Sequence, residues 1–174
     1  EKTSTAIKTR GFWLGTNLIT ALIAASVINI FKETLEQVIF LAVLMPIIAS
    51  MGGVAATQTL TITVRGLALG QIVRANYLYI FNRELLVGIS NGFIWAVILS
   101  LIACSWFQDW LLAWVICLSM IINLVAGVLS GMGIPILLKS LKMDPAVAGS
   151  VIVTTVTDVI GFFSFLGLAS YFYS

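Results

Sequence analysis

The stretch that decides the fold is AVAGSVIVTTVTDVIGFFSFLGLASYFY, residues 146–173, in which Asp158 is the only charged side chain. A helix needs about 20 apolar residues to cross the hydrocarbon core of a bilayer, so this stretch is long enough to span it. An alternating pattern typical of transmembrane strands is absent. The sequence therefore predicts an all-α integral membrane protein with five transmembrane helices, because four further apolar windows precede this one, at about 11–31, 37–63, 85–107 and 110–138.

The composition of the whole chain agrees with this prediction. Of its 174 residues, 60% are hydrophobic and 9% are charged, whereas soluble domains carry roughly 25% charge. The mean hydropathy is +1.11, so a water-soluble fold is excluded. Nine scattered Lys and Arg side chains make no basic stripe, so no nucleic-acid partner is expected. With no His and two isolated Cys, a zinc site or a His-based catalytic triad is not expected either.

The charges between the windows predict how the chain is oriented. Eight of the nine Lys and Arg residues lie at the N-terminus and in the loops after the second and fourth windows. The positive-inside rule places these segments in the cytoplasm and the C-terminus outside, as in a multi-pass protein of the cell's inner (plasma) membrane. Residues 65–83 mix arginines with leucines and tyrosines. They predict an interfacial helix on the cytoplasmic face, with an ordinary linker as the alternative.

Asp158 is the one ionisable residue deep inside a predicted span. A carboxylate at the centre of a membrane helix costs about 2.5–3.5 kcal/mol on insertion scales and usually faces a cavity, a partner or an ion path. Hydroxyl oxygens suit a hard cation or its water shell. The alternative is a protonated Asp158 bonded to a neighbouring helix, with hydroxyls that bond between helices. The small and hydroxyl residues that share its helical face are Ser150, Thr154, Thr157 and Gly161.

The window 37–63 carries a matching stripe that begins at Pro46. A proline inside a helix removes one backbone donor, and irregular backbone in a membrane is tolerated only against protein or a wet cavity. This helix is therefore expected to line a pore together with the helix at 146–173, and a kinked packing helix is the alternative. The predicted pore-lining residues are Ser50, Gly53, Thr57 and Thr61 here, with Ser150 and Thr157 on the last helix.

The remaining windows predict packing rather than chemistry. Small residues recur four apart along 85–107 and 110–138, which lets helix backbones approach closely. Asn123 interrupts the second of these windows, and a buried amide there needs a partner. No nucleophile–base pair or phosphate loop appears, so no enzyme activity is expected. An intramembrane aspartyl protease would need two carboxylates, and therefore a symmetric pair of chains.

A symmetric pair would also help an ion site. One carboxylate balances a divalent cation poorly, whereas two chains related by a two-fold axis offer two copies of Asp158. Mg²⁺ retains several waters and needs few protein carboxylates, while Ca²⁺ usually gathers more direct oxygen ligands. These residues favour a homodimer in the lipid bilayer that moves a hydrated or partly hydrated divalent cation, most simply Mg²⁺.

Two motifs resemble the MgtE family of magnesium transporters. PIIASMGGVAATQT at 46–59, followed by VRGLA at 64–68, resembles the second helix of that family. DPA at 144–146 and TTVTDVIGF at 154–162 resemble its fifth helix. The resemblance covers the whole chain, and related eukaryotic carriers are similar too. It implies a homodimeric magnesium channel or transporter whose pore follows the dimer axis and is lined by the second and fifth helices.

The resemblance also implies roles for particular residues. The family's pore aspartate, which holds hydrated magnesium, falls on Asp158. Supporting positions fall on Gly53 and Thr57 in the second helix, and on Thr154 and Gly161 in the fifth, where they join Asp158 in the expected metal site. The glycine-rich motif departs from the family pattern at two positions. Val54 stands where a pore-lining Asn is usual and Ala56 where a Gly is usual, which is expected to alter ion choice or rate.

The resemblance leaves alternatives open. Family members often carry cytosolic N and CBS domains that sense magnesium; this sequence contains neither, and it starts at Glu1 rather than Met, as a fragment or trimmed chain would. A Na⁺- or H⁺-coupled exchanger of divalent cations would use the same carboxylate. A membrane assembly or sensor subunit that transports nothing would leave Asp158 bonded to a neighbouring helix.

Overall fold

A computed structural model describes the whole chain, residues 1–174, which forms helices and turns without strands. Five helices are long and apolar enough to cross a membrane, and this confirms the predicted all-α membrane fold. A short helix and one turn of 3-10 helix lie between them. The elements in chain order are α1 Thr3–Ile30, α2 Lys32–Gln37, α3 Phe40–Ala68, η1 Arg74–Asn76, α4 Tyr77–Phe107, α5 Trp110–Ser140 and α6 Val147–Tyr173.

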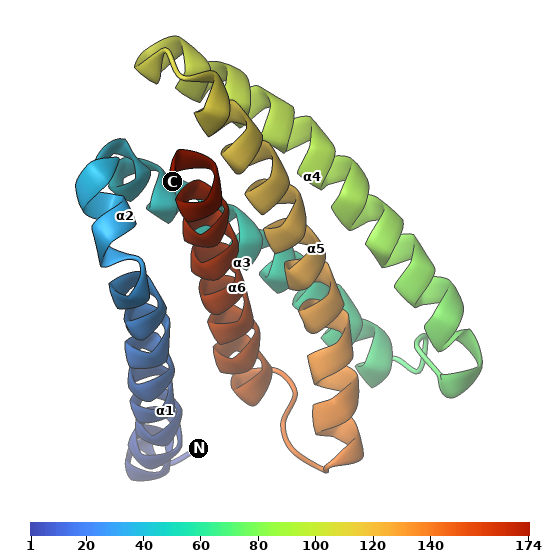
Figure 1. Cartoon of the computed structure of the whole chain (residues 1–174). Helices are drawn as coiled ribbons and strands as arrows, with labels where there is room; N and C mark the ends of the chain where they lie inside the picture. The colour runs from blue at the N-terminus through green and yellow to red at the C-terminus, as the bar shows by residue number, and fades with distance from the viewer.

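The central helix of the bundle is α5 (Figure 1). It packs along α3, α4 and α6, and α3 also packs on α6. In contrast, α3 and α4 scarcely touch each other, and α1 packs mainly on α6. The two termini lie at opposite ends of the bundle (Figure 1), as an odd number of spans requires.

The apolar core is concentrated at one end of the bundle. It joins the first half of α3, the first half of α5 and the second half of α6. Towards the other end a second, smaller cluster of Ala56, Leu60 and Val153 is buried between the helices. The helices are therefore held firmly at the end where α6 finishes, and grooves remain between them towards the other end. The largest side chains of the main core include Leu41, Leu44, Ile48, Ile116, Met120, Phe165 and Leu166.

Glycines allow α5 to approach α3 at backbone distance. A Cβ atom on Gly127 would lie 2.7 Å from the carbonyl oxygen of Gly52, and one on Gly131 would lie 2.6 Å from that of Ala56. On the other side of α5, a Cβ on Gly92 of α4 would lie 3.3 Å from the Cα of Ile121. The packing role predicted for small residues spaced four apart is confirmed at these seams.

The connection between α3 and α4 differs from the separate interfacial helix expected over 65–83. The helix α3 runs to Ala68, a turn follows in which Gly70 has a φ of +69°, and α4 begins at Tyr77 after η1. The turn is closed locally. The backbone N–H groups of residues 71 and 72 donate to the carbonyl of Gly66, and the Asn76 side chain accepts from the N–H of Val73 and donates to the carbonyl of Gln71. These bonds leave no free segment of helical length between the two spans.

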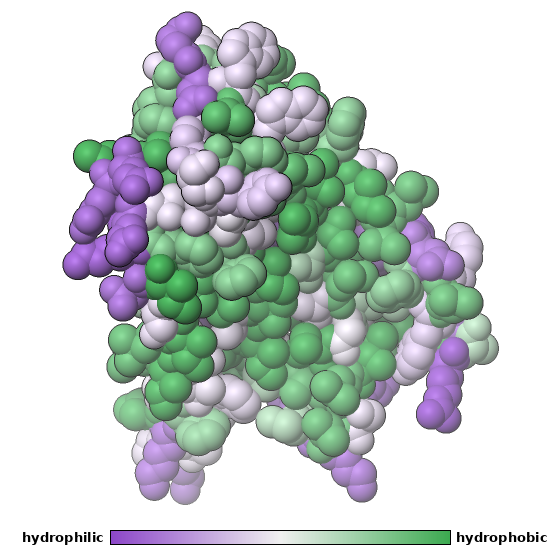
Figure 2. Space-filling view, in the orientation of Figure 1, coloured by the Kyte–Doolittle hydropathy of each residue, from purple (hydrophilic) through white to green (hydrophobic).

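The ends of the molecule carry most of its hydrophilic surface. Figure 2 shows a band of hydrophobic residues across the middle of the displayed face, with hydrophilic residues gathered towards its margins. The first helix begins at Thr3, so the polar residues expected to precede the span extend it as helix. A band of this kind is what lipid contact requires, and the chain is a multi-pass membrane protein.

Candidate ion site

An open groove, which we call the α3–α6 groove, lies where these two helices meet. It has a volume of about 570 Å³ and is bounded on the α6 side by Thr154. The four α3 residues predicted to line a pore all line this groove. Val54, which stands where the family usually has a pore-lining Asn, lines it too. The α3 residues along it are Ser50, Gly53, Val54, Thr57, Gln58, Thr61 and Ile62.

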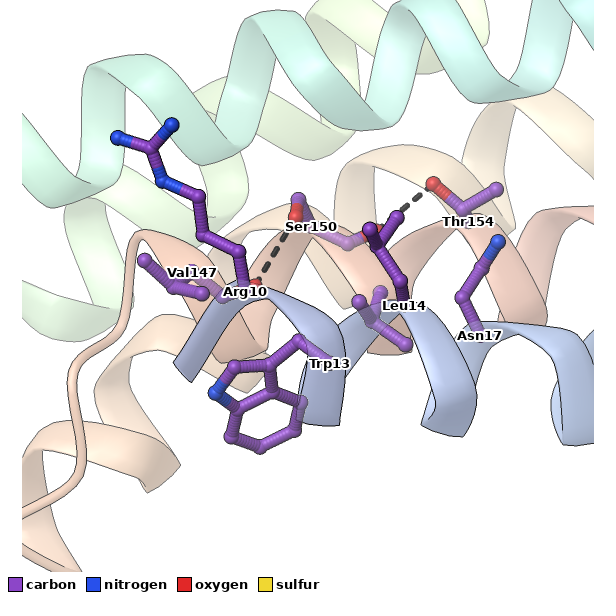
Figure 3. A pocket seen from close by; sticks show the side chains of 8 residues that line it. Arg10, Trp13, Leu14, Asn17, Val147, Ser150 and Thr154 are labelled. Carbon is purple, nitrogen blue, oxygen red and sulfur yellow. Dashed lines mark hydrogen bonds between the residues drawn. The ribbon is translucent and has the colours of Figure 1, made fainter. Parts of the chain in front are cut away.

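A second groove lies between α1 and α6, with a volume of about 440 Å³ (Figure 3). Arg10 and Asn17 of α1 line it together with Ser150 and Thr154 of α6. Because Thr154 lines both grooves, the hydroxyl stripe of α6 is open on two sides. Sequence reasoning missed the α1 residues. The available signal was an amide, Asn17, seven residues after Arg10 and thus on the same face of an otherwise apolar helix.

The threonine hydroxyls of both stripes bond back to their own helices. Thr57 donates to the carbonyl of Gly53 at 2.9 Å and Thr61 to that of Thr57 at 2.8 Å. On α6, Thr154 donates to the carbonyl of Ser150 at 2.7 Å, as Figure 3 shows. Each hydroxyl hydrogen is thus used within the helix, and the oxygen keeps lone pairs for other partners. The groove consequently offers acceptors, which suit a cation or the waters around it.

Asp158 lies near the middle of α6. Eleven residues separate it from Val147, which places it about 16 Å along the helix at a rise of about 1.5 Å per residue. Its side chain is half-buried, one turn beyond Thr154. No group of three or more His, Cys, Asp or Glu side chains gathers anywhere in the chain. One chain therefore supplies a single carboxylate at this depth of α6.

Two of the predicted site residues lie behind the grooves. Thr157 is fully buried, with its hydroxyl bonded to the backbone of its own helix, and Gly161 is buried as well. A Cβ on Gly53 would lie 4.0 Å from the Thr157 hydroxyl oxygen, so this is where α3 and α6 meet. Successive residues turn by about 100° around a helix, so residues three or four apart do not lie strictly in line. The polar stripe of α6 is therefore wide enough that one of its edges lies in the contact with the neighbouring helix.

Asn123 is the buried amide of the bundle, as its sequence position predicts. Its Nδ2 donates to the carbonyl of Ile48 on α3 at 2.9 Å, while its Oδ1 is buried without a partner. The side chain occupies the space that Cβ atoms on Gly52 and Gly161 would need. Asn123 thus joins α3, α5 and α6 at one point, and it meets α6 at Gly161, three residues after Asp158.

Replacing Asn123 with Ala should destabilise the fold by about 2 kcal/mol, because it removes the bond to Ile48 and leaves a cavity between three helices. Thermal unfolding of the detergent-solubilised protein measures this. Asn82→Ala, at an exposed amide on α4, serves as the control and should leave the transition temperature unchanged. Equal shifts for both variants would contradict the junction role of Asn123.

Comparison with known proteins identifies the family. The model of the MgtE family, described as divalent cation transporters, matches residues 45–168. This chain belongs to the MgtE family. It is 33% identical over 160 residues to the magnesium transporter MgtE of Bacillus subtilis, covering 92% of this chain and 36% of that protein. The proteins of the same name from Enterococcus faecalis and Thermus thermophilus are 29% identical, over 92% and 90% of this chain and 35% of each relative.

The chain spans about a third of the length of these MgtE relatives. The matched residues run from α3 to most of α6 and so include the α3–α6 groove and Asp158. The two departures from the motif lie in different places. Val54 is 53% exposed in the groove, whereas Ala56 is fully buried against the glycines of α5. Val54 therefore changes the surface of the groove, and Ala56 changes the contact between α3 and α5.

Proposed function

We propose that this chain is the transmembrane pore domain of a homodimeric divalent-cation channel or transporter, and that Mg²⁺ is the ion it moves. The observation that carries the proposal is the oxygen-lined α3–α6 groove, whose α6 side is Thr154, one helical turn before Asp158, on a membrane protein of the MgtE family. The relatives described above bear the name of magnesium transporters, which supports the choice of ion.

The exposed hydroxyl face of α3 argues for water rather than lipid beside it. Ser50, Thr57 and Thr61 are exposed on one side of a helix that otherwise presents apolar residues. Polar groups within a membrane are costly in hydrocarbon and usually face a bundle interior or a water-filled cavity. A second copy of the chain facing this side across a two-fold axis would enclose the groove and keep it wet.

The two-fold arrangement also supplies the missing charge. Two copies of Asp158 would balance one divalent cation, and Mg²⁺ that retains most of its waters needs no more than such a pair. We assign ion binding to Asp158, supported by the Thr154 hydroxyl one turn away, with Gly161 as a supporting position at the contact with Asn123. The path is lined by Ser50, Gly53, Val54, Thr57, Thr61 and Ser150, with Thr157 behind them at the helix contact.

Mg²⁺ uptake into liposomes that contain the purified chain tests the transport proposal. We expect uptake down a Mg²⁺ gradient, above that of protein-free liposomes, with Ca²⁺ and Mn²⁺ tested as alternative ions. If uptake requires an opposing Na⁺ or H⁺ gradient, the protein is a coupled exchanger and not a channel. No uptake under any of these conditions would overturn transport and favour an assembly or sensor subunit.

Cross-linking tests the dimer. In a background that lacks both native thiols, Cys104→Ser with Cys117→Ser, the variant Ser50→Cys should form a covalent dimer with a short bismaleimide in membranes, because its side chain would face its own copy. Ser90→Cys is the matched control, since Ser90 is exposed on α4, away from the groove. Equal cross-linking of the two variants, or cross-linking of the control alone, would contradict a dimer axis along this groove.

A further inference from the structure

The gap between α3 and α4 forms a third groove, which adjoins the α3–α6 groove along α3. Because these two helices scarcely touch, they leave a space of about 320 Å³ above α5. Leu124 and Val128 of α5 contribute to its wall. We call it the Glu84 groove after the charged residue within it. Its polar lining consists of Gln58, Thr59, Glu84 and Asn91.

Glu84 is the only charged side chain of the molecule that is buried, with 7% of its surface exposed. It extends the packing face of α4 that continues through Gly88 and Gly92, so it faces α5 rather than the outside. Seven residues separate it from the start of α4, or about 10 Å along the helix. None of the side-chain hydrogen bonds or ion pairs of the chain involves its carboxylate. A carboxylate without a protein partner in this groove is free to bind a cation.

The other polar groups of the groove are oxygen donors. Gln58 and Asn91 contribute amide oxygens from α3 and α4, and Thr59 contributes a hydroxyl. Thr59 is 3% exposed, and its hydroxyl forms no bond to its own helix, unlike the hydroxyls of Thr57 and Thr61 on the pore face. No Lys or Arg lines the groove. Carboxylate, amide and hydroxyl oxygens together are the ligands of hard cations.

We propose that the Glu84 groove holds one monovalent cation of the size of Na⁺, bound by the Glu84 carboxylate and by the oxygens of Gln58, Thr59 and Asn91. The charge count selects the valence. Glu84 contributes one negative charge and its neighbours contribute none, so a monovalent cation leaves the site neutral. A divalent cation would leave an uncompensated positive charge in a poorly polarisable environment. The groove has room for waters that complete the shell, since each water takes about 30 Å³ in the liquid.

The site is separate from Asp158 but lies next to the α3–α6 groove. Val54, Gln58 and Ile62, spaced four apart along α3, line both spaces and form the ridge between them. A cation in the Glu84 groove would fix the Gln58 side chain on one side of this ridge. The cation site does not depend on the proposed transport function, because its ligands are complete within one chain.

Equilibrium binding of ²²Na⁺ to the purified chain in nanodiscs tests the site. The measurement uses the Asp158→Asn variant as background, which removes the carboxylate of the proposed pore. The result then does not depend on whether the proposed pore conducts ions. In this background we expect one saturable ²²Na⁺ site per chain, which K⁺ and Mg²⁺ displace only at much higher concentration. Adding Glu84→Gln should abolish binding, and adding Glu33→Gln, at an exposed acid on α2, should not change it.

A second variant separates loss of binding from unfolding of the protein. Asn91→Leu removes one neutral ligand at an exposed position and should weaken ²²Na⁺ binding about tenfold while the elution volume of the protein stays the same. Binding that survives Glu84→Gln, or no saturable binding in the Asp158→Asn background, would overturn the proposal. Tighter binding of Mg²⁺ than of Na⁺ at this site would overturn the charge argument.

Discussion

Asp158→Asn should reduce Mg²⁺ flux through the reconstituted chain about 100-fold or more. A charge-assisted contact contributes about 1.5–3 kcal/mol, and a dimer loses two of them at once. Since each 1.4 kcal/mol is a factor of about ten in affinity, the ion would lose most of its residence in the pore. The Asn side chain keeps the shape of Asp, so the half-buried position on α6 remains filled.

The matched control for this flux measurement is Glu36→Gln, which removes an exposed carboxylate from α2 at a distance from both stripes. It should transport Mg²⁺ as the wild type does. If Asp158→Asn and the wild type gave the same initial rate in liposomes with equal protein content, the role assigned to Asp158 would be lost. The family membership of the chain would be unaffected by that result.

Gly131→Ala should destabilise the bundle by about 2–3 kcal/mol. The new Cβ would lie 2.6 Å from the carbonyl oxygen of Ala56 and 2.9 Å from the Cβ of Thr59, so two helix backbones must separate. Overpacking of this kind typically costs about 1–3 kcal/mol, and Gly131 lies in the extensive contact between α5 and α3. Steric-trapping or denaturant unfolding in detergent measures the change.

Gly133 provides a close control for the same helix. Nothing lies within 4 Å of a Cβ at this position, so Gly133→Ala only adds helix propensity, worth up to about 1 kcal/mol. Its unfolding free energy should be equal to or slightly above that of the wild type. If Gly131→Ala and Gly133→Ala were equally destabilised, the close approach of α5 to α3 at Gly131 would not explain the loss of stability.

Much of the candidate site was accessible from residue spacing. The hydroxyl stripe on α3 could be predicted because residues three or four apart share a helical face, and Ser50, Thr57 and Thr61 do line one groove. The buried amide Asn123 was predicted for the same reason. Spacing could not show which edge of a stripe is covered. Thr157 lies under the neighbouring helix, and Arg10 and Asn17 enter a groove of α6 from a helix that the pattern did not connect with it.

Glu84 shows most clearly what spacing leaves open. In the sequence it stands next to Arg83 at the edge of an apolar window and reads as a loop charge. In the structure α4 begins at Tyr77, so Glu84 lies inside the helix and faces α5. The length of α4 depends on the tight turn after Gly70, and local hydropathy carries little information about such a turn.

The residue pattern was enough to identify a five-helix membrane protein with two oxygen-rich faces and one deep carboxylate on α6. Length, hydropathy and helical periodicity are local properties, and they suffice for those conclusions. The packing of the helices was needed to show that α5 is central, that α3 and α4 stand apart, and that Glu84 and Asn123 are buried. Lipid is as apolar as a leucine side chain, so apolar faces alone do not choose their partners, and close fit between particular residues does.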